Sequence, residues 1–153
     1  MNNKLITNFK KLHEQLIGLV DNVPIKDRDK IIFDKWSLKD ILVHLIAWND
    51  LDTSRITSLQ KGETFEWVDD WDEFNKIELT KRQTLAWEEI YKDFVDSGVK
   101  LASAYQALDE KLWNKRFGPK NSITATKDLK GMIEHYEKDH IPQLEAFLLT
   151  LKS

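Results

Sequence analysis

The chain has 153 residues, of which 41% are hydrophobic, and its 23 basic and 26 acidic side chains leave a formal net charge of −3. This length predicts one domain spanning residues 1–153, and the near balance of charge excludes a uniformly basic surface that grips nucleic acid. The absence of cysteine excludes disulfides and thiolate chemistry. The lack of a membrane-length apolar run or a signal-peptide-like N-terminus predicts a cytoplasmic protein without a membrane partner.

Apolar residues recur at steps of three and four in the first half of the chain, which predicts two amphipathic helices. The first spans residues 3–20 and ends before Pro24, because the residue before a proline is pushed out of the helical region. The second spans residues 38–61. Ser37 and Asp40 have the spacing of a capping box and predict its start.

The connection after the second helix is acidic and aromatic. Residues 63–74 read ETFEWVDDWDEF, with six acidic and four aromatic side chains. We expect a loop that leads into a short helix containing Phe74 and Ile77. Two interpretations of this stretch stay open: a solvated connection held by aromatic anchors, or a lid over a pocket.

The second half of the chain predicts two more long helices, over about residues 85–108 and 127–151. Thr126 is the expected cap of the last helix, and Pro142 predicts a kink within it. No segment has the pattern of a strand. The sequence therefore predicts an all-α protein, a four-helix bundle with a long crossover between its second and third helices.

Histidines are the side chains best suited to chemistry in a chain without cysteine. His44 lies at the border of the apolar face of the second helix, and His140 lies within the apolar face of the last one. On a straight helix His135 is about 140° from His140, too far around to meet the same metal ion. His13 has no partner at ligand spacing, so we expect it to be a hydrogen-bonded core residue.

Six further residues are candidates for the same site. Tyr136 and Glu137 occupy the positions four and three residues before His140, from which a ligand could join it. Asp52 lies near the centre of a buried helix face and is a candidate catalytic base or partner to a ligand. Trp48 and Tyr136, with Trp67 and Trp71, could wall a binding pocket.

The segment that opens the second helix, WSLKDILVHLIAW at residues 36–48, resembles the DinB-like (DinB/YfiT) superfamily, whose second helix carries Trp-Ser/Thr-x-x-Asp followed by His-Leu-x-x-Trp. The similarity continues at residues 72–75, DEFN, and at residues 139–144, DHIPQL. One branch of this superfamily, the ClbS/DfsB proteins, protects against colibactin and is generally not described by a metal triad.

The resemblance implies a four-helix bundle that holds a divalent metal, often nickel or zinc, on three histidines. His44 would be the first and His140 the last. The middle position is occupied here by Tyr136, and His135 is one residue out of phase. Three alternatives stay open: a bulge or kink turns His135 inward, Glu137 or Tyr136 replaces it, or the site has been lost.

Three functions are consistent with these observations. The first is a metal-dependent transferase or hydrolase that acts on a small molecule. The second is a metal-free protein that binds and sequesters a small molecule, as in the ClbS/DfsB branch. The third is a helical homodimer without a small-molecule site.

Overall fold

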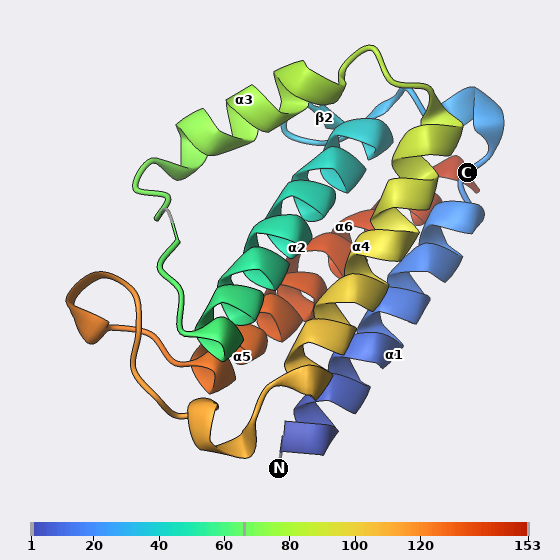
Figure 1. The fold of residues 1–153 in the computed structure, drawn as a ribbon. Helices are drawn as coiled ribbons and strands as arrows, with labels where there is room; N and C mark the ends of the chain where they lie inside the picture. Colours follow the sequence, from blue (N-terminus) through green and yellow to red (C-terminus); the bar gives the residue numbers. More distant parts are fainter. Residues whose placement is uncertain (1, 66, 153) are drawn as a thin grey trace.

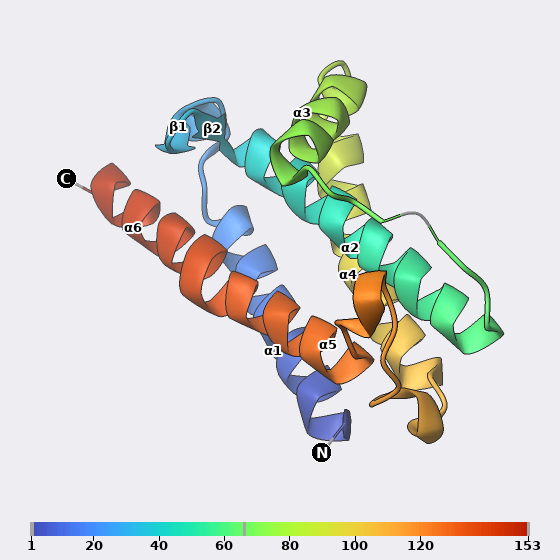
Figure 2. The same ribbon diagram turned by 90° about the vertical axis from the view of Figure 1, so that its left-hand side faces the viewer.

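The computed structural model describes residues 2–65 and 67–152, and this part of the chain is mostly helical. The long helices α1 (Asn2–Asp21), α2 (Leu38–Lys61) and α4 (Trp87–Ala107) lie side by side (Figure 1). α5 (Ala125–His135) and α6 (Ile141–Leu151) continue one another along α1 (Figure 2). The prediction of a mainly helical protein is confirmed.

The helices meet around a shared apolar interior. Each long helix contributes fully buried side chains, among them Phe9, Leu16, Ile41, Leu45, Phe94 and Leu144. Burial of one such side chain stabilises the fold by about 1.5–3 kcal/mol, so this shared interior provides most of the driving force for packing. Shorter 3₁₀ turns at Ile25–Asp27, Glu110–Leu112 and Pro119–Asn121 lie in the connections between helices.

Both ends of α2 form as the sequence predicts. The Ser37 hydroxyl accepts a hydrogen bond from the Asp40 backbone N–H, and the Asp40 carboxylate accepts one from the Ser37 N–H at 3.0 Å. At the other end Gly62 has a φ of 70°, the left-handed conformation in which glycine pays no steric penalty. These caps fix the register of the helix that carries His44.

The expectation that the chain contains no strand is wrong at one place. β1 (Ile31–Phe33) and β2 (Trp36–Ser37) form a small antiparallel hairpin just before α2. Its turn places Asp34 at a φ of 54°, a conformation that Asp adopts more readily than most residues. Strands of two or three residues are too short to show an alternating pattern in the sequence.

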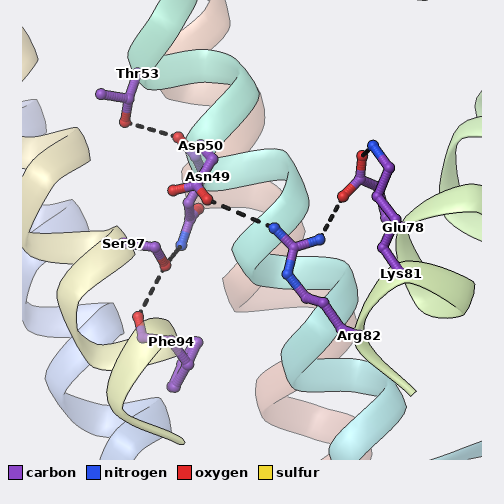
Figure 3. Close-up of polar contacts among 8 residues, drawn as sticks. All are labelled: Asn49, Asp50, Thr53, Glu78, Lys81, Arg82, Phe94 and Ser97. Atoms are coloured by element: carbon purple, nitrogen blue, oxygen red, sulfur yellow. Dashed lines mark hydrogen bonds and ion pairs between the residues drawn. The ribbon is translucent and has the colours of Figure 1, made fainter. Parts of the chain in front are cut away.

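The short helix expected after the acidic connection is α3 (Trp71–Arg82), and it contains both Phe74 and Ile77. Asp70 caps it by accepting the Glu73 N–H at 3.0 Å. α3 lies against the outside of α2 (Figures 1 and 2). Arg82 reaches Asp50 of α2 at 3.9 Å and also pairs with Glu78, which fastens the end of α3 to α2 (Figure 3).

The last predicted helix departs most from expectation. It begins at Ala125 and is capped by Thr124, whose hydroxyl accepts the Lys127 N–H at 3.2 Å, so the assignment of Thr126 as the cap is wrong. α4 likewise begins at Trp87, two residues after the predicted start.

Between α5 and α6 the chain forms a π-helical turn, Tyr136–His140, in which the Ile141 N–H donates to the Tyr136 carbonyl five residues earlier. Pro142 lies at the start of α6, where its missing N–H is tolerated and the wider turn relieves its crowding of the preceding carbonyls. The last helix is therefore interrupted, as the kink prediction expects, but by a π turn.

Among the described residues, no helix combines the length and apolar character needed to cross a lipid bilayer.

Candidate metal centre

Three histidines converge beside the π turn that joins α5 to α6. His44 comes from α2, His135 from the end of α5, and His140 from the end of the π turn. The Nε2 atom of His135 lies 3.0 Å from that of His44 and 2.9 Å from that of His140. The potential ligand atoms of the three rings all lie within 4.8 Å of one another. His44 and His140 are buried, and His135 is half-buried.

The π turn is what brings His135 into this cluster. Hydrogen bonds of the i→i+5 type stack residues five apart, whereas an α-helix stacks residues three or four apart. His135 and His140 are five apart, and their ring centres are 4.4 Å from each other. Of the three alternatives left open by the sequence, the described geometry is that of a local bulge that turns His135 inward.

A neighbouring side chain determines which nitrogen of His44 carries hydrogen. The Asn75 Oδ1 atom accepts the Trp48 Nε1–H at 2.9 Å and lies 2.9 Å from His44 Nδ1. Indole nitrogen can only donate, so this Asn75 atom is the oxygen and His44 Nδ1 must be the donor. The lone pair of neutral His44 is therefore on Nε2, the atom that faces the other two histidines.

The same arrangement recurs at the other two rings. His135 Nδ1 lies 2.9 Å from Asp139 Oδ2, and His140 Nδ1 lies 3.0 Å from Gln143 Oε1. Both oxygens accept hydrogen bonds, so both Nδ1 atoms donate, and each neutral ring again presents the Nε2 lone pair to the cluster. In metal sites, a histidine that binds the ion through one ring nitrogen usually donates a hydrogen bond from the other nitrogen to an acceptor of this kind.

Three lone pairs that face one another at this distance require a cation between them. A proton could supply it, but burial lowers the pKa of His44 to about 4 and, with the neighbouring histidines, lowers the pKa of His140 far below its ordinary value. Near pH 7 these two rings are therefore neutral. Their Nε2 lone pairs are therefore available to bind a metal ion.

The donor set suits a divalent transition metal. Imidazole nitrogen is a good ligand for zinc, nickel, copper and iron, and a three-histidine site leaves coordination positions open for other ligands. Nitrogens bound to one tetrahedral zinc ion are about 3.3 Å apart, from bond lengths of about 2.0–2.1 Å. The Nε2 separations of 2.9 and 3.0 Å need only a small expansion to reach this value.

Tyr136 lies away from the cluster, in the interior between the helices. Its hydroxyl accepts the Asn49 Nδ2–H at 3.1 Å and lies 3.1 Å from His13 Nδ1. His13 Nε2 donates to the Val95 carbonyl at 3.0 Å, so His13 Nδ1 accepts from the Tyr136 hydroxyl. Burial raises the pKa of Tyr136, which keeps the phenol neutral. The hydroxyl is thus satisfied within the core, and His13 is the hydrogen-bonded core residue that the sequence predicts.

The Asn49 amide extends this core network to α4. Asn49 donates to the Ser97 hydroxyl at 3.1 Å, and Ser97 donates to the Phe94 carbonyl at 2.9 Å (Figure 3).

Glu137, the other candidate third ligand, is exposed on the π turn and is not among the residues whose ligand atoms converge.

A pocket of about 370 Å³ opens beside the histidines. Each of three helices contributes one face to it, with residues spaced three or four apart. Trp48 of α2 stacks on Trp71 of α3, with ring centres 4.2 Å apart, and forms part of the wall. The lining residues are His44, Trp48, Asp52, Arg55, Trp71, Asn75, Asp128, Gly131, Met132 and His135.

Asp52 lies in this lining, near the opposite end of the pocket from His44. Eight residues at about 1.5 Å each place it about 12 Å along α2 from His44. Asp52 is 3% exposed, and its Oδ2 atom accepts the Tyr105 hydroxyl at 2.8 Å. Burial and the nearby Asp128 carboxyl raise the pKa of Asp52. This position disfavours direct proton transfer between Asp52 and a group held at the histidines.

The sequence reasoning assigned no role to several residues that the fold brings into the site. Asn75, Asp139 and Gln143 were named only as parts of the similar motifs, and Arg55 and Asp128 were given no place in the site. The spacing of Trp71 and Asn75, and of Asp128 and His135, was the available signal, because residues at such steps share a helix face.

Comparison with known proteins identifies no relative of this chain: no protein-family model, curated protein or solved structure matches it.

Proposed function

We propose that this protein is a DinB-like four-helix bundle, with α3 in its crossover, and a metal-dependent transferase or hydrolase that acts on a small molecule. The observation that carries the proposal is the convergence of the His44, His135 and His140 Nε2 atoms, each ring held by an acceptor on its other nitrogen. The resemblance of residues 36–48 to the superfamily agrees with it.

A divalent ion held there, nickel or zinc, would supply a Lewis acid with open coordination positions for a water, thiol or substrate oxygen. The residues of the chain do the rest. His44, His135 and His140 bind the ion. Trp48 and Trp71 form a stacked aromatic wall of the adjoining pocket and pack against the apolar part of a substrate.

The test is metal binding by protein purified without an affinity tag. Titration with Zn²⁺ and with Ni²⁺ should give one site per chain and raise the unfolding temperature, because a ligand that binds only the folded state stabilises it. His135→Ala should abolish both effects. Asp139→Asn, which weakens the acceptor behind His135, should reduce affinity about 10–100-fold.

Glu137→Gln is the matched control, because Glu137 lies on the same π turn but is exposed and outside the cluster. It should bind metal as the unchanged protein does. Absence of bound metal, with no change in the unfolding temperature on titration, would refute the proposal.

A second candidate function is metal-free binding of a small molecule. The stacked Trp48–Trp71 pair beside a pocket of about 370 Å³ favours it, since aromatic walls suit a planar ligand. Quenching of tryptophan fluorescence by ligands in EDTA, with no zinc or nickel binding, would distinguish this function from the first.

A further inference from the structure

Buried polar atoms without a partner concentrate at the end of the pocket away from the histidines. Six buried side-chain nitrogen or oxygen atoms of the described residues have no hydrogen-bond partner, and four of them belong to Asp52, Arg55 and Asp128. All three residues line the pocket. Leaving a buried polar group unpaired destabilises the fold, so such a concentration is expected where a ligand supplies the missing partners.

Arg55 presents a free edge of its guanidinium group. The side chain is 4% exposed, and Trp67 covers one face of the guanidinium with 4.2 Å between Cζ and the ring centre. Its Nη1 atom lies 4.0 Å from Asp128 Oδ1, whereas Nε and Nη2 have no partner. Trp67 covers one face of the guanidinium, so the Nε–Nη2 edge stays available for hydrogen bonds. The two parallel N–H donors of this edge fit a planar acceptor group.

The two carboxyl groups beside Arg55 offer acceptors. Asp52 Oδ2 is taken by the Tyr105 hydroxyl, but Asp52 Oδ1 has no partner, and neither does Asp128 Oδ2. Burial and the neighbouring Asp128 carboxyl raise the pKa of Asp52. The cluster therefore holds unpaired acceptors beside the unpaired donors of Arg55.

We infer that Asp52, Arg55 and Asp128 form a subsite, here called the polar end, that binds an uncharged planar group of the carboxamide or urea class. The carbonyl of such a group accepts from the free edge of Arg55, and its N–H groups donate to the unpaired carboxyl oxygens. A carboxylate has no N–H group for the carboxyl oxygens, and an amidinium has no acceptor for the Arg55 edge, so either would leave buried polar atoms unpaired.

This inference rests on the proposed function in one respect, since it names the substrate class for the same pocket. His44 and Asp52 are about 12 Å apart along α2, and the Trp48–Trp71 stack lies between these ends of the pocket. The substrate is therefore an aromatic or other apolar amide or urea, anchored by that group at the polar end and presenting its reacting group to the histidines.

Three probes with the same ring and different charge test the polar end: benzamide, benzoate and benzamidine. Affinities are measured at pH 7 in EDTA by quenching of tryptophan fluorescence and by ligand-observed NMR. Benzamide should bind about tenfold more tightly than either charged probe. Arg55→Met should remove most of the benzamide affinity and shift the preference toward the cationic benzamidine, because two carboxyl groups then remain without the guanidinium.

Arg55→Lys is the second variant, because it keeps the charge and loses only the planar fork. It should lose about tenfold in benzamide affinity, while retained zinc binding and a cooperative unfolding transition show that the variant is folded. Equal binding of all three probes, tightest binding of benzoate, or benzamide affinity that is the same in Arg55→Lys would overturn the inference. Equal binding of all three probes is expected if only water molecules form hydrogen bonds with the unpaired atoms.

His135→Ala separates this inference from the proposed function. The variant should lose zinc binding and retain benzamide binding, since His135 contributes to the opposite end of the pocket. Zinc binding without preference for benzamide refutes only the polar end, and preference for benzamide without zinc binding refutes only the metal-dependent function.

Discussion

In the metal-free protein, a fall in pH from 7 to 5 should destabilise the fold through His44. Burial lowers the pKa of His44 to about 4, against 6.5 for the unperturbed ring. The unfolded chain therefore takes up the proton first, and stability falls as the pH drops below 6.5 until it passes about 4. Linkage makes the loss about 2 kcal/mol between pH 7 and pH 5, and about 3 kcal/mol by pH 4.

The assay is urea denaturation in EDTA at pH 7, 6 and 5, for the unchanged protein and for His44→Asn. Asparagine can still donate to Asn75 Oδ1 from near the position of His44 Nδ1, but it does not titrate. Groups away from the cluster titrate in both proteins, so the difference between the two pH profiles reports the titration of His44 together with its effect on the neighbouring His140. The variant should lose about 2 kcal/mol less over this range. Parallel profiles for the two proteins would refute the reasoning.

Glycines give two further predictions. Gly131 lines the pocket, and a Cβ there meets no atom within 4 Å, so Gly131→Leu should weaken benzamide binding without lowering the unfolding temperature. Gly18→Leu, equally open but on α1, should leave binding unchanged. Retained binding in the first variant would contradict the pocket assignment. A Cβ at Gly98 would lie 2.2 Å from the His13 ring, so Gly98→Ala should cost about 1–3 kcal/mol in urea denaturation. A variant as stable as the unchanged protein would show that the ring can move aside.

Local signals in the sequence were sufficient for the elements whose ends depend on neighbouring residues. Ser37 and Asp40 satisfy backbone groups only three residues apart, and Gly62 supplies a left-handed residue at the point where α2 ends. Such interactions involve adjacent turns and need no knowledge of the rest of the fold. The β1–β2 hairpin was missed because its strands have too few residues to show a pattern.

The candidate metal centre was predicted only in part, and the reason is the geometry of one turn. His44 and His140 could be identified from their places on apolar helix faces. His135 could not, because a helix wheel assumes about 100° per residue, and the π turn changes the spacing that brings side chains together. Pro142 marked the disturbance of the helix without showing its form.

The sequence by itself determined that the chain is mainly helical, where α2 begins and ends, and that His44 and His140 lie on inward faces, because these follow from short-range spacing. Only the tertiary structure decided which side chains meet. Asn75 reaches His44 from another helix, and Arg55 lies beneath Trp67 beside Asp128, contacts that join residues 12 to 73 positions apart. Packing of whole helices sets such distances, and no local pattern records them.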